Sequence, residues 1–263
     1  MFSTDIDDTI VSDFGDRHCF QQAWETLGAH ERPLLVYNSG RSVVDTEWLV
    51  LQHRLPPPEF VIGSIGTEVH DPIDASVAGA FRAHIAEGWD RDTVEKIVQG
   101  IQEARLQPSA FLNDYKLSWH WHRASRAELF RLEYRLKEAG LDVTVSYTNS
   151  VFLDIIPRHA GKGNALAWLC DRIGVPTDEI IVAGASANNI GMFALPRVRG
   201  ILVGNASAEL FDGARNFRPF VACEKAAAGV LAGLRHFGVL PASARQAEPQ
   251  AHPTASVGAA GWG

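Results

Sequence analysis

Three carboxylates stand close together near the start of the chain, in the run Asp5-Ile6-Asp7-Asp8-Thr9. The run follows an apolar segment that predicts a strand, and open α/β sheets form their sites at the carboxyl ends of strands. Asp5 is placed to attack a phosphorus atom, while Asp7 is placed to protonate the leaving alcohol and later deprotonate water. A single Asp here would be ordinary turn or helix-cap chemistry. Three carboxylates repel one another unless a cation or a lysine offsets them, so we favour the catalytic interpretation.

Two further groups of residues follow predicted strands or open a predicted helix. The run Asn38-Ser39-Gly40-Arg41 offers a hydroxyl and a backbone amide to an anion, although Ser-Gly after a strand is more often plain turn chemistry. The run Ala160-Gly161-Lys162-Gly163-Asn164 enters a helix, where Lys162 would present a point charge to a phosphate and to Asp5. A solvated lysine is an equally good interpretation of the second run.

These three groups, in this order, resemble the motifs of the haloacid dehalogenase superfamily, and the DxDxT signature is the most specific of them. Three details resemble the sucrose-phosphate phosphatases within it. They are the Ser-Gly-Arg-Ser run at 39–42, Gly66-Thr67-Glu68, and Leu153-Asp154-Ile155-Ile156-Pro157 leading to Gly161-Lys162-Gly163. The resemblance covers residues 1 to about 238.

The resemblance implies a Rossmann-like core, an inserted α/β cap and a Mg²⁺ cofactor. It implies that Mg²⁺ is held by the Asp5 side chain and the Asp7 backbone carbonyl, with Asn189 as a further ligand. It assigns phosphate or substrate binding to Thr9, Ser39, Gly40, Arg41, Glu68, Lys116, Lys162 and Asn188. The substrate of such free-standing phosphatases is a disaccharide phosphate.

The fourth motif departs from the family pattern Gly-Asp-Ser-Gly-Asn-Asp. The corresponding run here is Gly184-Ala185-Ser186-Ala187-Asn188-Asn189, so both acids are replaced. Ala185 has no ligand atom in its side chain, and Asn189 offers a neutral oxygen. We therefore expect weakened activity or a high Mg²⁺ requirement.

The order of the elements predicts an α/β fold with a Rossmann-like three-layer core and a parallel sheet. Apolar runs predict strands at 1–6, 33–38, 60–65, 180–183 and 200–203, and helices at 20–27, 44–51, 163–173 and 190–193. We expect core segments at 1–73 and 158–240, an inserted cap at 74–157, and a disordered tail at 241–263.

The predicted cap contains helices at 92–104 and 127–139, and strands at 116–122, 143–147 and 151–156. The strand Leu117-Ser118-Trp119-His120-Trp121-His122 alternates aromatic and other side chains. Its indoles would either stack on sugar rings or, as we favour, pack against the cap helices. The histidines have no partners at zinc-ligand spacing.

A net charge of −7 and a pI of about 5.8 argue against nucleic acid or an anionic membrane as a partner. The N-terminus predicts neither a signal peptide nor a membrane span. Cys19, Cys170 and Cys223 lack metal-ligand spacing and predict reduced, buried thiols, which favours a cytoplasmic location.

We therefore expect a Mg²⁺-dependent phosphomonoester hydrolase acting through an aspartyl-phosphate. Its substrate would be a sugar phosphate, foremost sucrose 6-phosphate or a related disaccharide phosphate. The alternative is a non-catalytic pseudo-phosphatase that binds a sugar phosphate or regulates a sugar-phosphate synthase as its partner. Phosphoryl transfer to another acceptor is disfavoured by the cap type that the resemblance implies.

Overall fold

A twisted, mostly parallel sheet forms the centre of the molecule in the computed structural model, which describes residues 1–12, 18–53 and 55–241. The strand order is β11-β10-β9-β1-β2-β3-β4, with β4 antiparallel to β3. The strands are β1 (Phe2–Thr4), β2 (Leu35–Asn38), β3 (Phe60–Gly63), β4 (Glu68–His70), β9 (Ile181–Gly184), β10 (Arg199–Leu202) and β11 (Phe220–Val221). Because β1 pairs with both β2 and β9, the segments after these three strands emerge side by side.

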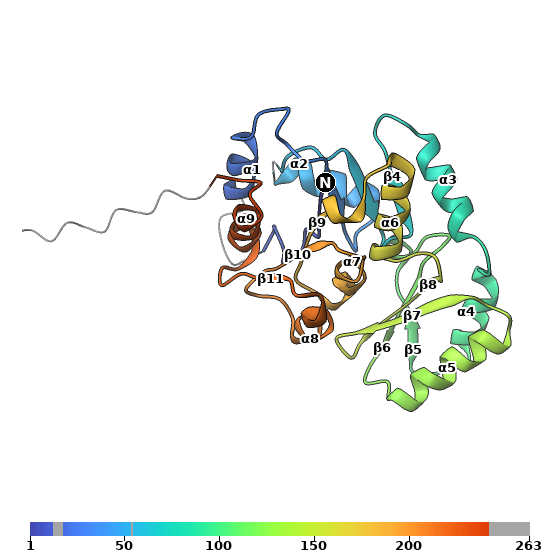
Figure 1. Cartoon of the computed structure of the whole chain (residues 1–263). Coiled ribbons are helices and arrows are strands. Elements are labelled where there is room, and N and C mark those ends of the chain that lie inside the picture. The colour runs from blue at the N-terminus through green and yellow to red at the C-terminus, as the bar shows by residue number, and fades with distance from the viewer. Residues whose placement is uncertain (13–17, 54, 242–263) are drawn as a thin grey trace, which may run out of the picture.

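Helices cover both faces of this sheet, as Figure 1 shows. One face packs on α1 (His18–Glu25), α2 (Val43–Gln52) and α9 (Ala226–His236), through a cluster that includes Phe2, Trp24 and Val230. The other face packs on α3 (Ser76–Ile85), α6 (Lys162–Ile173), α7 (Ile190–Phe193) and α8 (Ala208–Ala214), through a cluster that includes Val36 and Leu166. This arrangement confirms the predicted three-layer α/β core.

A second, antiparallel sheet has the strand order β5-β6-β8-β7. Its strands are β5 (Ala104–Leu106), β6 (Leu117–Trp121), β7 (Val143–Thr148) and β8 (Phe152–Pro157). The helices α4 (Arg91–Gln99) and α5 (Arg126–Glu138) pack on one face of it, where Trp119 and Trp121 are buried with Leu132. Both indoles therefore belong to the core of this unit, as the favoured interpretation of the strand had it. We call residues 88–158 the cap unit.

The first and last residues of the cap unit, Gly88 and Arg158, both form backbone hydrogen bonds with Asp142. The Asp142 N–H donates to the Gly88 carbonyl at 2.8 Å, and the Asp142 carbonyl accepts the Arg158 N–H at 3.0 Å. The helix α3 precedes Gly88 in the chain, and its Val77, Phe81 and Ile85 side chains join the apolar cluster of the main sheet. Packing thus groups α3 with the core, whereas the predicted cap bounds of 74–157 would include it. Those domain bounds stay a prediction.

The expected strands and helices occur close to their predicted positions, with differences at their ends. The predicted helix at 92–104 ends at Gln99, and Ala104 already begins β5.

Cys223 is exposed, so the prediction of a buried thiol was wrong there, while Cys170 is buried as predicted. Among the described residues, no helix has the length and apolar character needed to cross a membrane. The predicted disordered tail at 241–263 lies outside the described residues, except for Pro241.

Candidate active site

The first residue beyond β1 is Asp5, and its side chain is 5% exposed. Its Oδ1 accepts the Ile6 N–H at 2.9 Å. Its Oδ2 lies 2.9 Å from the Lys162 Nζ and accepts a hydrogen bond from the Asn189 Nδ2 at 2.8 Å. The carboxylate predicted to be the nucleophile is therefore buried at the end of the central strand, with one cation and two N–H groups around it.

Lys162 reaches Asp5 because it is the first residue of α6, which starts at the carboxyl end of the sheet. The Asn38 Nδ2 donates to the Lys162 carbonyl at 3.0 Å, and the Gly161 N–H donates to the Gly66 carbonyl at 3.1 Å. Gly66 has a φ of +83°, and a Cβ there would stand 2.2 Å from the Gly161 carbonyl carbon. This glycine contact lets the loop after β3 pack against the start of α6, so the helix presents Lys162 to the site.

The turn after β2 holds Ser39, Gly40 and Arg41. Ser39 is buried, and its Oγ accepts the Arg41 N–H at 3.1 Å. Arg41 forms a two-pronged ion pair with Asp7, through Nε to Oδ2 at 2.8 Å and Nη2 to Oδ1 at 2.9 Å. The hydrogen bond to Asp7 raises the pKa of Arg41 above its usual value. Arg41 thereby fixes the direction of the carboxylate that was predicted to be the acid and base.

The fourth-motif loop, Gly184 to Asn189, contributes amides in place of carboxylates. The Asn189 Oδ1 accepts the N–H groups of Ala185 and Ser186, each at 3.0 Å. Two backbone donors at that atom fix the amide orientation, so the nitrogen is the atom that faces Asp5. The Asn188 Oδ1 accepts from the Ser186 Oγ at 2.8 Å and from the Asn189 Nδ2 at 3.0 Å. Both amide oxygens of the loop are used within the protein.

This set of donors does not suit the Mg²⁺ ion expected from the sequence. Mg²⁺ prefers octahedral oxygen ligands, commonly with one or two carboxylates. Of the expected ligands, the Asp7 backbone carbonyl remains, but the loop offers the buried methyl group of Ala185 and an N–H of Asn189 in place of carboxylates. The Asp7 carboxylate is paired with Arg41. Within residues 1–12, 18–53 and 55–241, no group of three or more His, Cys, Asp or Glu side chains could hold a metal ion. Asn189 thus acts as a donor to Asp5, whereas the sequence predicted it as an oxygen ligand.

Thr9 and Glu68, which were both predicted to bind phosphate or substrate, form hydrogen bonds within the protein. Thr9 is fully buried in the turn after β1, where its N–H donates to the Ile6 carbonyl at 3.2 Å. Glu68 begins β4, and its Oε2 accepts the Val43 N–H at 2.8 Å. Its Oε1 accepts from the Asn113 Nδ2 at 3.1 Å. Glu68 therefore ties the start of α2 to the cap unit.

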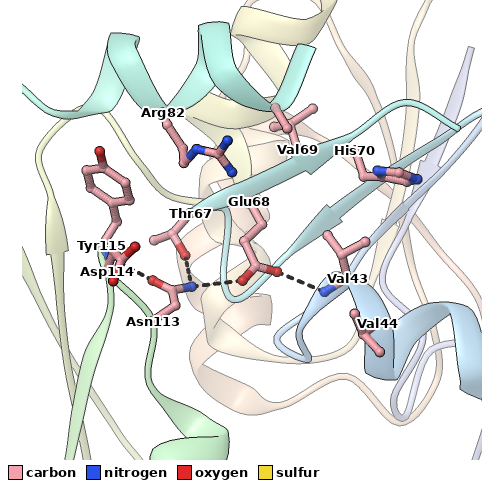
Figure 2. Close-up of a pocket in the computed structure, with 11 residues that line it drawn as sticks. Val43, Val44, Thr67, Glu68, Val69, His70, Arg82, Asn113, Asp114 and Tyr115 are labelled. Atoms are coloured by element: carbon pink, nitrogen blue, oxygen red, sulfur yellow. Dashed lines mark hydrogen bonds between the residues drawn. The ribbon is translucent and has the colours of Figure 1, made fainter. Parts of the chain in front are cut away.

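A cavity of about 300 Å³ lies at this junction between the core and the cap unit. Figure 2 shows Asn113 beside Thr67 and Glu68, where the Asn113 Nδ2 also donates to the Thr67 Oγ1 at 3.0 Å. The cavity is lined by Val43, Val44, Thr67, Glu68, Val69, His70, Ala78, Arg82, Asn113, Asp114 and Tyr115. Asp5, Asp7 and Lys162 are not among these residues, so the cavity does not enclose the nucleophile predicted from the sequence.

A second cavity, of about 290 Å³, lies between the cap hairpin at 147–150 and the fourth-motif loop. Ser186 and Asn188 line it on the core side. At the hairpin tip, Asn149 and Ser150 both have positive φ values, of 54° and 55°. Asn188, predicted to bind phosphate or substrate, therefore lies where the cap hairpin faces the core.

On the cap unit, Lys116 lies just before β6 and is buried. Its Nζ is 4.0 Å from the Asp154 Oδ1, and the same carboxylate oxygen accepts a hydrogen bond from the Ser118 Oγ. Burial lowers the pKa of Lys116, while the charges of Asp154 and Glu68 oppose that shift. Lys116 and Ser118 alternate with the core-facing Leu117 and Trp119, so they point away from α4 and α5.

Two residues near the junction were missed by the sequence reasoning as site candidates, namely Asn113 and Asp154. Asn113 stands in a polar run, Asn113-Asp114-Tyr115, immediately before a predicted strand, which is a turn signal. Asp154 is a charged residue inside an otherwise apolar strand. A charge at such a position calls for a buried partner, and this signal could have identified it.

Comparison with known proteins agrees with this geometry. Mannosylfructose-phosphate phosphatase from Agrobacterium fabrum is 36% identical over 242 residues, which are 92% of this chain and 98% of that protein. Sucrose-phosphatase 1 from Nicotiana tabacum is 30% identical over 254 residues, and the matched part is 92% of this chain and 60% of the tobacco protein. The chain thus spans less than two thirds of the plant relative.

Solved structures support the same assignment. The sucrose-phosphatase from Synechocystis, determined with sucrose and phosphate, has a TM-score of 0.81 at 27% identity, covering 90% of this chain and 97% of that one. A haloacid dehalogenase-like hydrolase from Bacillus subtilis shares the fold, with a TM-score of 0.63 at 17% identity. The profile of the sucrose-6F-phosphate phosphohydrolase family matches residues 1–238. This chain therefore belongs to the sucrose-6F-phosphate phosphohydrolase family.

Proposed function

We propose that this chain hydrolyses the phosphate monoester of a disaccharide that contains fructose. The observation that carries the proposal is the buried pair of Asp5 and Lys162 at the end of the central strand, with 2.9 Å between Oδ2 and Nζ. A carboxylate at this position is a nucleophile for phosphorus, and the neighbouring ammonium attracts the phosphate to it. Membership of a family named for a phosphohydrolase supports the same reaction.

In the proposed reaction, the Asp5 carboxylate attacks phosphorus and the bond from phosphorus to the sugar oxygen breaks. In the reactive state Asp7 has left its ion pair with Arg41 and has taken up a proton from water. It gives this proton to the leaving oxygen, and an aspartyl-phosphate remains. Asp7 then takes a proton from water, which attacks phosphorus and frees inorganic phosphate and Asp5. Lys162 and the hydroxyl of Ser39 bind phosphoryl oxygens in both steps. Because the groups around Asp5 do not suit Mg²⁺, none of these steps involves that ion.

The choice of a fructose-containing disaccharide comes from the relatives. The names of the Agrobacterium and tobacco proteins specify phosphates of mannosylfructose and of sucrose, and both sugars contain fructose. Polar side chains at the junction, among them Glu68, Asn113 and Lys116, are suited to hydrogen-bond sugar hydroxyls. We propose that the sugar extends from Asp5 toward this junction and that the cap unit selects it.

The test is phosphate release from sucrose 6-phosphate and from mannosylfructose phosphate, each measured over a Mg²⁺ titration and in EDTA. Asp5→Asn removes the nucleophile and is expected to abolish release. Asp212→Asn makes the same change at an exposed position of α8 and is expected to leave release unchanged. Release that survives Asp5→Asn would refute the proposed nucleophile.

A second candidate function is favoured by the fourth-motif loop, where Ala185 and Asn189 replace both acids. In that case the chain binds a sugar phosphate without hydrolysing it and regulates a sugar-phosphate synthase. A glucosylglycerol-phosphate synthase from Pseudomonas anguilliseptica is 26% identical over 251 residues, which are 31% of that protein. Retained binding of sucrose 6-phosphate by calorimetry, without release under any condition, would favour this function. A cytoplasmic location stays a prediction for both.

A further inference from the structure

We infer that the phosphate site of this chain binds its anion without a divalent cation, because the Asn189 amide and the Lys162 ammonium occupy the position beside Asp5 that a cation would need. The inference rests on the proposed phosphate site and concerns how that site handles charge. It follows from the direction of one side-chain amide, which the sequence alone does not give.

The N–H donors around Asp5 leave its Oδ2 atom unsuited to bind a metal ion. The Asn189 Nδ2 stands 2.8 Å and the Lys162 Nζ 2.9 Å from the Asp5 Oδ2. A Mg²⁺ ion binds oxygen at about 2.0–2.1 Å, so it would meet the hydrogens of both donors at that oxygen. Both nitrogen groups are positively polarised, and each would repel the ion.

The amide cannot be turned over to offer its oxygen instead. Reversing it would point the NH₂ group at the N–H groups of Ala185 and Ser186, which now donate to Oδ1 at 3.0 Å each. Two buried backbone donors would then lose their acceptor.

Packing also holds the Asn189 side chain in place. It is fully buried, and a Cβ built on Gly184 would stand 2.6 Å from Oδ1. The absence of a side chain at Gly184 is what admits the amide at this position.

Two of the three carboxylates in the run at 5–8 are already paired with cationic side chains. Asp5 is paired with Lys162, and Asp7 is paired with Arg41. An acid at position 185 or 189 would add a negative charge beside Asp5, and an acid at 189 would replace a donor with a second acceptor. Such a site needs a cation. The natural amide and methyl group remove that need.

The first experiment titrates Mg²⁺ alone, without phosphate, and follows calorimetric heat and the thermal midpoint. The natural chain is expected to show no saturable binding at millimolar Mg²⁺. The double variant Ala185→Asp/Asn189→Asp is expected to bind at least about tenfold more tightly. Asn216→Asp, the same amide-to-acid change at an exposed position, should behave like the natural chain. Equal Mg²⁺ affinity in the natural chain and the double variant would overturn the inference.

The second experiment measures the affinity of the natural chain for inorganic phosphate, in EDTA and in Mg²⁺. Equal affinities are expected, and an affinity about tenfold tighter in Mg²⁺ would overturn the inference. This measurement decides the question even if the double variant fails to fold. Absence of phosphate release, together with absence of Mg²⁺ binding, would refute hydrolysis and leave this inference standing. Mg²⁺-dependent release would support hydrolysis and overturn this inference.

Discussion

Removing one partner of the Asp5 and Lys162 pair is expected to destabilise the fold strongly. The side chains are 5% and 0% exposed, so water does not screen a charge that is left alone. Breaking a buried ion pair by removing one partner costs about 3–5 kcal/mol. Lys162→Met keeps most of the packing of the lysine stem and removes only the charge. For a domain of this size, that loss corresponds to a thermal midpoint lower by roughly 6–20 °C.

The assay is urea unfolding of a double-mutant cycle, followed by circular dichroism. The variants are Lys162→Met, Asp5→Asn and the combination of both. Because the combination leaves no unpaired charge, its loss of unfolding free energy should be smaller than the sum of the single losses by about 2–3 kcal/mol. Losses that add within about 0.5 kcal/mol would refute the reasoning. Asn189 and Ile6 alone would then suffice to stabilise the Asp5 carboxylate.

Three further predictions concern a backbone contact, a thiol and a buried lysine. Gly66→Ala is expected to lower the thermal midpoint and phosphate release together, because φ is +83° and the added Cβ would stand 2.2 Å from Gly161; unchanged stability would contradict this contact. Iodoacetamide at neutral pH is expected to label exposed Cys223 and spare Cys170, since burial raises the Cys170 pKa to about 12, and mass spectrometry of the peptides checks it. Burial lowers the pKa of Lys116, so the unfolded chain holds more protons between that lowered pKa and the ordinary value of 10.5. Stability should therefore rise with pH in that window, and Lys116→Met should flatten the rise in urea midpoints.

The common location of Asp5, Ser39 and Lys162 at one edge of the sheet could be predicted, because the carboxyl ends of parallel strands lie at the same edge. Their motifs follow two neighbouring strands and open one helix, and the order of the elements brings those points together. The sequence also marked the fourth-motif loop as unusual. The direction of the Asn189 amide could not be predicted, because it depends on where two backbone N–H groups of the folded loop point.

The helix α3 was missed for a different reason. Its buried residues Val77, Phe81 and Ile85 have helical spacing, but Gly79 and several alanines between them weaken the signal. The contact of Asn113 with Glu68 also escaped prediction, because it depends on how the cap unit sits on the core. Long-range contacts of this kind join separate segments and leave no local pattern in the sequence.

The backbone hydrogen bonds that join Asp142 to both ends of the cap unit bear on the evolutionary origin of this unit. Gly88 and Arg158 contact opposite sides of one residue, so the two ends of the insert lie next to each other. A module with adjacent ends can enter a surface loop of a host without pulling the host apart, and closing that loop with a longer chain costs little additional entropy. The cap unit therefore has the geometry of an exchangeable module, whose side chains can diverge while the strand end that carries Asp5 stays the same.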